Sequence, residues 1–233
     1  MCKHYVIGDV HGMYNTLLAL LKKIPKDAKV IFVGDLIDRG KDSAKVIKLV
    51  RDSGYKVVLG NHEDTLIRFF NDFKAGMSLD ELKHKWKLWI YSNGGIDTLN
   101  SYNFFSQEKS SLEALEDDIM WLQSLPLYLK LNAKHKSNLP IVVSHSNITN
   151  VWHLRDDKSK FKEFKDTTIR GRDLIYNKKS KIVNIIGHTP IEELNSNSNI
   201  INVDRGCCYN LPEFATLAAY CIEDDNFFEI KAI

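Results

Sequence analysis

The chain has 233 residues, of which 44% are hydrophobic and 27% are charged, and its formal net charge is +2. This balance is typical of a soluble globular protein with one sizeable domain. The small net charge gives no indication of a stable nucleic-acid partner, and no apolar run approaches the roughly 20 residues that a membrane-spanning helix needs.

The cysteines give no sign of a disulfide framework. Their spacing matches no zinc-site pattern, and two of them are adjacent: Cys2, Cys207, Cys208 and Cys221. The N-terminus passes directly into a short apolar segment, without the charged and apolar regions of a signal peptide. We therefore expect a protein that resides in the reducing cytoplasm.

The first third of the chain predicts alternating strands and helices. Apolar strand patterns occupy residues 5–7, 30–33 and 57–59, and each is followed by apolar residues at helical spacing. Pro25 ends the first helix, because proline cannot continue the helical hydrogen-bond ladder. The β-α-β-α-β order indicates a largely parallel sheet with helices packed against it.

The rest of the chain predicts a helical insert followed by more strands. Residues of about 75–138 carry apolar and aromatic side chains at helical spacing, which favours a helical cap beside the sheet. Strand patterns then occupy 139–143, 182–186, 200–203 and 215–222, and the polar segment 149–181 is expected to be a long functional loop with some helix. We expect residues 1–233 to form a single α/β domain.

Five motifs follow these predicted strands, and all are rich in metal-binding side chains. They are GDVHG at 8–12, GDLIDRG at 34–40, GNHE at 60–63, SHSN at 144–147 and GHT at 187–189. In open parallel sheets, the loops at the carboxyl ends of neighbouring strands converge and bind ligands. The five motifs are therefore expected to meet at one place.

The side chains in these motifs suit two divalent cations. Asp9 and His11 are two positions apart on an extended segment, so both can project to the same side. Asp35 follows the next strand, and its carboxylate could bridge two cations. A neutral oxygen and two imidazoles are left for the second cation: Asn61, His145 and His188. Such a cation pair would attract a phosphoryl group and acidify a bridging water, which would attack in line with the leaving group.

Hydrolysis of a phosphate ester also needs a proton for the leaving oxygen and a cation for the phosphoryl oxygens. His62 follows Asn61 and could be aimed at the leaving group, with Asp38 orienting its imidazole. Arg39 could make bidentate contacts to the phosphoryl group.

This set of motifs resembles the calcineurin-like metallophosphoesterases, and among them the phosphoprotein phosphatase family. The compact bacterial and phage-type serine/threonine phosphatases and the symmetrical diadenosine tetraphosphate hydrolases carry similar motifs, and Asn93-Gly94-Gly95 is similar to a turn in the phage-type members. The resemblance runs in order from Gly8 to about Asp204. It implies a four-layer α/β/β/α sandwich, that is, a β-sandwich flanked by helices.

The resemblance also implies roles for individual residues. The first metal would be held by Asp9, His11 and Asp35, and the second by Asp35, Asn61, His145 and His188. His62 and Asp38 would form the acid pair, while Arg39 and Arg172 would bind phosphate. Manganese is the expected metal, with iron, zinc, nickel and magnesium as alternatives, because oxygen and imidazole ligands accept several ions.

The sequence defines the type of reaction better than it defines the substrate. Asp38 within GDLIDRG and the compact length favour a serine/threonine-type protein phosphatase that acts on phosphoproteins and small phosphate esters. Leu59 stands where protein phosphatases usually have an arginine, and it favours the alternative, a symmetrical diadenosine tetraphosphate hydrolase that releases two molecules of adenosine diphosphate. A third possibility is a scaffold without activity, but competent residues occupy all six ligand positions.

Each motif also has a purely structural explanation. An aspartate after a strand can cap a helix, Asn61 can be a turn residue, and His62 can simply begin a helix. Arg172, in a polar loop, can be a solvated surface arginine. The occurrence of all five motifs in order, each after an apolar strand, favours the catalytic interpretation.

Overall fold

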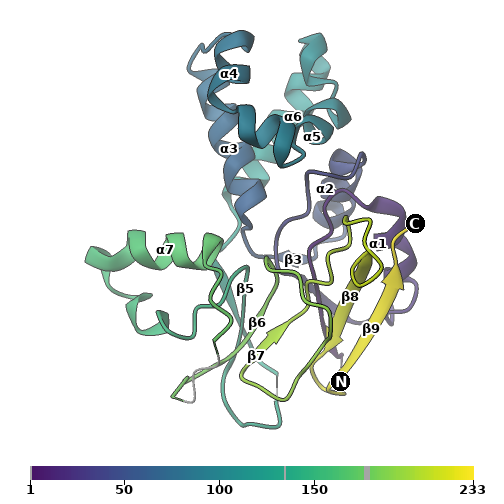
Figure 1. Ribbon diagram of the computed structural model, residues 1–233, viewed down its shortest axis with the longest axis vertical. Coiled ribbons are helices and arrows are strands. Elements are labelled where there is room, and N and C mark those ends of the chain that lie inside the picture. The colour runs from purple at the N-terminus through teal and green to yellow at the C-terminus, as the bar shows by residue number, and fades with distance from the viewer. Residues whose placement is uncertain (1, 134, 176–178) are drawn as a thin grey trace.

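Two β-sheets packed face to face form the centre of the protein (Figure 1), in a computed structural model that describes residues 2–133, 135–175 and 179–233. Residue 134, in the expected insert, and residues 176–178, in the expected polar loop, lie outside the described part. None of the helices in the described part is both long and apolar enough to cross a lipid bilayer.

The first sheet has the strand order β3-β2-β1-β8-β9. Three of its strands are parallel, as the sequence predicts: β1 (His4–Ile7), β2 (Lys29–Phe32) and β3 (Lys56–Val57). β8 (Thr216–Cys221) and β9 (Asn226–Lys231) extend this sheet in antiparallel order. The sequence analysis missed β9, an edge strand whose residues are largely exposed and therefore lack a clear apolar pattern.

The second sheet contains the later strands in the order β4-β5-β6-β7. β5 (Ile141–Ser144), β6 (Val183–Ile186) and β7 (Ile200–Asn202) are parallel, and β4 (Tyr128–Leu131) is antiparallel to β5. The expectation that residues 75–138 are helical is therefore wrong at its C-terminal end. β4 escaped the sequence analysis because it is short, lies at an edge and is only partly buried.

Alternating side chains of the first sheet contribute to two separate cores. Val6 and Ile31 face the second sheet and pack in one core with Ile185, whereas Tyr5 and Phe32 face the helices on the opposite side. This alternation follows from the two-residue repeat of a strand. It explains why these strands read as continuous apolar runs, since both of their faces are buried.

Helices cover the outer faces of the two sheets. α1 (Tyr14–Leu21) and α2 (Ser43–Asp52) contribute to the core on the first sheet, and α7 (Phe161–Arg170) buries Phe164 against Val142 of the second. Figure 1 shows α7 on the opposite side of the sheets from α1 and α2. These layers confirm the expected α/β/β/α sandwich and the expected helix within the polar segment 149–181, which also has 3-10 turns at Trp152–Leu154 and Lys158–Lys160.

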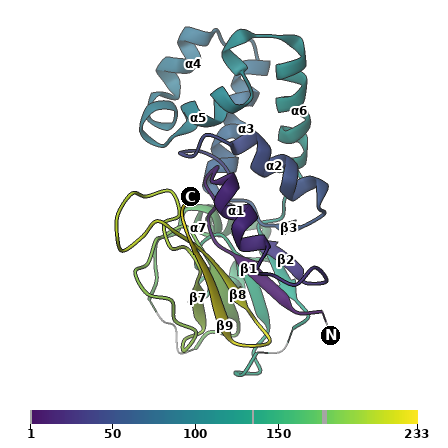
Figure 2. The same cartoon turned by 90° about the vertical axis from the view of Figure 1, so that its right-hand side faces the viewer.

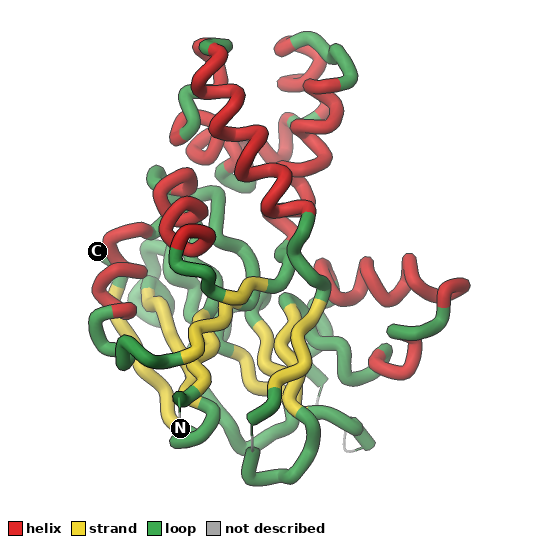
Figure 3. The backbone as a smooth tube through the Cα atoms, turned by 180° about the vertical axis from the view of Figure 1, so that it is seen from behind, coloured by secondary structure: helices red, strands yellow, loops and turns green. Residues whose placement is uncertain are grey.

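The remaining helices project beyond one end of the sandwich, as Figures 2 and 3 show. α3 leads away from the sheets, and α6 returns to β4. The helical elements are α3 (Asn61–Lys74), α4 (Leu79–Lys85), a π-helical turn (Leu88–Ser92), α5 (Gly95–Ser101), a 3-10 turn (Phe104–Ser106) and α6 (Lys109–Gln123). We call residues 75–123 the helical insert. Its apolar side chains form one continuous core with those of α3, α1 and α2.

The core between the two sheets predicts a large stability cost for one substitution. Ile185 is completely buried there, so Ile185→Ala should lower the free energy of unfolding by about 2–5 kcal/mol through lost burial and the cavity left behind. Urea denaturation, monitored by circular dichroism, measures this change. Ile175→Ala is the matched control, because Ile175 is 74% exposed and its truncation should change stability by about 0.5 kcal/mol or less. Equal losses for both variants would contradict the assignment of this core.

Candidate metal centre

The five motifs meet at the carboxyl ends of strands from both sheets. Three motifs follow β1, β2 and β3 of the first sheet, and two follow β5 and β6 of the second. The sequence predicted this convergence from the order of strands in its first third, which indicated a largely parallel sheet, while the family resemblance implied two sheets. Two sheets achieve the same result because they pack face to face with these ends together.

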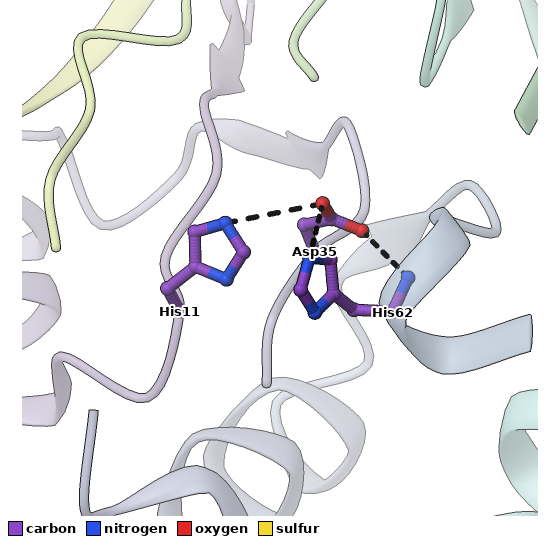
Figure 4. Close-up of side chains that lie close together, drawn as sticks. All are labelled: His11, Asp35 and His62. Carbon is purple, nitrogen blue, oxygen red and sulfur yellow. Dashed lines mark hydrogen bonds and ion pairs between the residues drawn. The ribbon is translucent and has the colours of Figure 1, made fainter. Parts of the chain in front are cut away.

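Asp35 lies at the centre of this cluster (Figure 4). Its Oδ2 atom is 3.9 Å from Nε2 of His11, 3.8 Å from Nε2 of His62 and 3.4 Å from Nε2 of His145. The Asp35 side chain is only 3% exposed. A single buried carboxylate therefore contacts imidazoles that come from three other loops.

The other candidate ligands lie beside this carboxylate. Ligand atoms of Asp35, His145 and His188 lie within 4.8 Å of one another, and a second such group contains His11, Asp35 and His62. Nε2 of His145 is 2.9 Å from Oδ1 of Asn61 and 3.1 Å from Nδ1 of His188. The structure therefore brings the neutral oxygen and both imidazoles of the expected second ligand set together.

Asp9 joins the cluster through the backbone of the last motif. Its carboxylate accepts a hydrogen bond from the His188 N–H, at 3.1 and 3.2 Å to its two oxygens. Burial, followed by the nearby charges of Asp204 and Asp35, raises the pKa of Asp9 well above its usual value. The close approach requires Gly187, because a Cβ atom there would overlap the Asp9 carboxylate.

The imidazoles are oriented for binding a cation. Nδ1 of His11 is 2.8 Å from the Ile37 carbonyl oxygen, and Nδ1 of His145 is 2.8 Å from that of Val33. Donation of the Nδ1–H to a carbonyl fixes the tautomer and directs the Nε2 lone pair towards Asp35, as in many metal-binding histidines.

The electrostatic environment also suits cation ligands. Burial, with the charge of His145, lowers the pKa of His188 to about 3, and burial lowers the pKa of His11 well below its usual value. Both imidazoles are therefore neutral at pH 7. Nε2 of His188 is buried without a hydrogen-bond partner, which is costly unless the site receives another group. The donor set of carboxylates, an amide oxygen and neutral imidazoles fits divalent cations.

The expected acid pair is formed in the structure. Nδ1 of His62 is 2.6 Å from Oδ2 of Asp38, whose side chain is fully buried. Burial by itself would lower the pKa of His62, but the charges of Asp35 and Asp38 raise it. The imidazole is thus held in the form that can donate a proton from Nε2.

The two expected phosphate-binding arginines differ in their placement. Arg39 is half-buried, with Nη1 2.8 Å from Nε2 of His11, and its guanidinium lies 5.1 Å from the ring centroid of Tyr209. Arg172 is exposed, and its charge contributes to the lowered pKa of His188. Both arginines therefore add positive charge beside the candidate ligands.

Half of the site depends on unfavourable backbone conformations. His11, Asp35, Asp38, Arg39 and His188 all have positive φ angles, between 46° and 72°. Residues with a Cβ atom avoid this region, and such strain is concentrated at functional sites. Aspartate and histidine adopt this region more often than most residues with a Cβ atom, and the surrounding contacts help to hold these loops.

Sequence analysis missed three supporting side chains. Glu63 is fully buried, and its carboxylate accepts backbone hydrogen bonds from Asp35 at 2.9 Å, Leu36 at 2.7 Å and Gly60 at 3.1 Å. Its place three residues after the N-cap Gly60 is a capping-box signal that could have identified it. The other two, Trp89 and Thr98, donate hydrogen bonds to Asp38, and no local pattern indicates this.

Comparisons with known proteins agree with this geometry. The sequence profile of the calcineurin-like phosphoesterases matches residues 3–218. The asymmetrical bis(5'-nucleosyl)-tetraphosphatase PrpE of Oceanobacillus iheyensis is 29% identical, over 97% of this chain and 91% of its own length. Serine/threonine-protein phosphatase 1 of Salmonella typhimurium is 26% identical, over 88% of this chain and 87% of its own. A symmetrical bis(5'-nucleosyl)-tetraphosphatase of Photorhabdus laumondii is 33% identical, but over only 66% of this chain and 47% of its own.

Solved structures support the fold. A putative diadenosine tetraphosphatase superposes with a TM-score of 0.65 at 19% identity, covering 100% of this chain and 94% of its own. The cold-active protein-tyrosine phosphatase of a Shewanella species has a TM-score of 0.57 at 18% identity, covering 98% of this chain and 77% of its own. At these identities the likeness establishes the fold alone.

Cation affinity should depend on pH. The pKa of Asp9 is raised by burial and neighbouring carboxylates, and Asp35 raises that of His145 although burial opposes it. Protons held by these groups at low pH must leave when a cation binds, so affinity for Mn²⁺ should increase as the pH rises. Titration calorimetry in two buffers of different ionisation enthalpy measures the affinity and the protons released. His84→Gln, at an exposed histidine, should leave the pH dependence unchanged; proton uptake on binding would contradict the expectation.

Glu63 should be required for the site to form. In Glu63→Gln an amide N–H₂ group replaces one carboxylate oxygen and faces a backbone N–H. The unpaired donor should lower the free energy of unfolding by about 1–3 kcal/mol and weaken Mn²⁺ binding, because Asp35 and Gly60 lose a common anchor. Thermal unfolding and calorimetry measure the two effects. Glu193→Gln, at an exposed glutamate, is the control and should change neither.

Proposed function

This chain belongs to the calcineurin-like phosphoesterase family and is a phosphoric ester hydrolase; we propose that it uses two divalent cations and acts on phosphoserine and phosphothreonine in proteins. One observation carries the proposal. The buried carboxylate of Asp35 lies within 3.4–3.9 Å of imidazole nitrogens from three other motifs. It belongs to a group with His145 and His188, which are part of the proposed second ligand set, and to a group with His11 and His62, of which only His11 belongs to the proposed first set.

Six side chains would hold the two cations. The first cation would be held by Asp9, His11 and Asp35. The second would be held by Asp35, which both cations share, with Asn61, His145 and His188. When bound, such a pair supplies positive charge for the phosphoryl oxygens and acidifies water at neutral pH. Manganese is the proposed metal, and iron, zinc, nickel and magnesium suit the same oxygen and imidazole donors.

The chain's own side chains would bind the substrate and move the proton. Arg39 would hold the phosphoryl oxygens, with its guanidinium restrained by the Tyr209 ring and by Cys208, whose Sγ is 3.5 Å from Nη1. Arg172 would add charge from the other side. Nε2 of His62 would donate its proton to the leaving oxygen, while Asp38 stabilises the imidazolium through Nδ1.

A protein substrate is supported by two observations. Asp38 is present in GDLIDRG, where the serine/threonine phosphatases have it, and it pairs with His62 in this structure. Serine/threonine-protein phosphatase 1 of Salmonella typhimurium is similar over most of both chains. The proposed partner is therefore a phosphorylated protein or a small phosphate ester. We also propose a cytoplasmic location, since all four cysteines are free thiols.

A dinucleoside tetraphosphate is the second candidate substrate. Leu59 is only 7% exposed, so this position supplies no cationic side chain where protein phosphatases usually have an arginine. The relatives that match nearly the whole chain include an asymmetrical hydrolase, whereas the symmetrical one matches over about half its length. The products distinguish the two: symmetrical cleavage gives two molecules of adenosine diphosphate, and asymmetrical cleavage gives adenosine triphosphate and monophosphate.

A substrate panel tests the proposal. Protein supplied with Mn²⁺ should hydrolyse phosphoserine and phosphothreonine peptides and aryl phosphates, with higher kcat/KM on the peptides than on diadenosine tetraphosphate. Asp35→Asn should reduce kcat/KM by more than the ~10–100-fold that loss of a residue supporting a metal ligand costs. Asp80→Asn, at a side chain that is 98% exposed, should retain full activity.

The panel also defines the contrary results. Much faster cleavage of diadenosine tetraphosphate than of every phosphopeptide would replace the protein substrate with the second candidate. Equal turnover by the wild-type protein and Asp35→Asn would place the activity outside this site.

A further inference from the structure

Asp38 receives hydrogen bonds from three side chains on different elements. Its Oδ2 atom is 2.6 Å from Nδ1 of His62 and accepts a hydrogen bond from Nε1 of Trp89 at 2.7 Å. Its Oδ1 atom accepts one from Oγ1 of Thr98 at 2.6 Å. Trp89 and Thr98 both belong to the helical insert, in the π-helical turn and α5 (Figure 1).

These contacts fix the rotation of the carboxylate. One donor from the insert occupies each oxygen, so Asp38 cannot turn its plane away from His62 without losing a hydrogen bond in a buried setting. The backbone N–H of Asp38 also donates to Oγ1 of Thr98 at 2.9 Å and to Oγ of Ser43 at 3.1 Å. These bonds help to hold Asp38 at a φ of 72°, which is unfavourable for an aspartate.

The insert itself holds these donors in place. The Trp89 ring is 4% exposed, lies 5.0 Å from the ring of Phe69 on α3, and packs so closely on Gly95 that a Cβ atom there would overlap it. The neighbouring Gly94, at φ +82°, accepts a hydrogen bond from the backbone N–H of Arg39 at 3.2 Å. One turn of the insert thus contacts both the acid pair and the phosphate-binding arginine.

We propose that Trp89 and Thr98 are positioning residues for proton donation to the leaving group: they hold Asp38 so that it presents the Nε2 proton of His62 to the leaving oxygen. The helical insert is then part of the reaction machinery and more than a cover on the sandwich. This inference rests on the proposed function, in which His62 is the acid.

Leaving-group dependence tests this role, because a poor leaving group needs a proton and a good one does not. Trp89→Phe keeps the ring and removes the N–H; Thr98→Val keeps the shape and removes the hydroxyl. For a phosphoserine peptide, whose leaving group is an alkoxide, each variant should lower kcat by about 10–100-fold at nearly unchanged KM. For 2,4-dinitrophenyl phosphate, whose phenolate leaves without protonation, kcat should change little. Thr98→Ser, which restores the hydroxyl, should recover the peptide activity.

Trp86→Phe is the matched control on the same insert. Trp86 donates its Nε1–H to Asp72 at 2.8 Å, away from the acid pair. Trp86→Phe should therefore show no selective loss of kcat on the phosphoserine peptide. Thermal unfolding and Mn²⁺ titration of each variant check that fold and cation binding are kept. If Trp89→Phe does not fold, the Thr98→Val and Thr98→Ser pair decides the question with the same two substrates.

Contrary outcomes separate the inference from the proposed function. Equal losses on both esters, no loss on either, or the same selective loss in Trp86→Phe would overturn the positioning role. In each of those cases the proposed function would still hold, provided that the wild-type protein hydrolyses the esters and Asp35→Asn does not. Failure of the wild-type protein to hydrolyse either ester would overturn both.

Discussion

The buried carboxylate of Asp35 joins the loops of both sheets. Its side chain contacts imidazoles that follow β1, β3 and β5, its carbonyl oxygen accepts hydrogen bonds from the N–H groups of Val10 and His11, and its N–H donates to Glu63. Two other candidate ligands, His11 and His145, and the proposed proton donor His62 therefore lie directly against this residue. The positive φ of 47° at Asp35 is maintained by these contacts, because an aspartate has no intrinsic preference for it.

The charges around Asp35 give the site its chemistry. Burial raises the pKa of Asp204 to about 6, and it also raises that of Asp9, while neighbouring imidazoles lower the pKa of Asp35 although burial opposes this. Buried carboxylates beside the neutral imidazoles of His11 and His188 belong to a donor set that suits divalent cations. Arg39 and Arg172 lie beside the same cluster. The arrangement therefore favours a substrate with several negative oxygens, and it does so whichever group carries the phosphate.

Local sequence patterns predicted those parts of the structure that local physics determines. Apolar runs located the parallel strands, and polar residues after them located the ligand loops, because a strand must end where its apolar run ends. The edge strands β4 and β9 were beyond such patterns, since none of their residues is fully buried. The supporting contacts were also beyond them: Asp38 lies 51 residues from Trp89 and 60 from Thr98. Only folding brings these residues together.

The contacts of the helical insert link the candidate site to a region outside the sandwich. Chemistry at the carboxyl ends of the strands depends on motifs that leave little freedom, as the overlap expected from a Cβ atom at Gly187 illustrates. The insert carries similar restraints at Gly94 and Gly95, where a Cβ atom would overlap Arg39 and Trp89. Its turn at Gly94 accepts a hydrogen bond from Arg39, and Trp89 donates one to Asp38. With the roles proposed for Arg39 and His62, a change in the insert would alter how the phosphoryl group is held and how the leaving group is protonated. Since proton donation matters more for an alkoxide than for a phosphate leaving group, the same contacts bear on the choice between a phosphoprotein and a dinucleoside tetraphosphate.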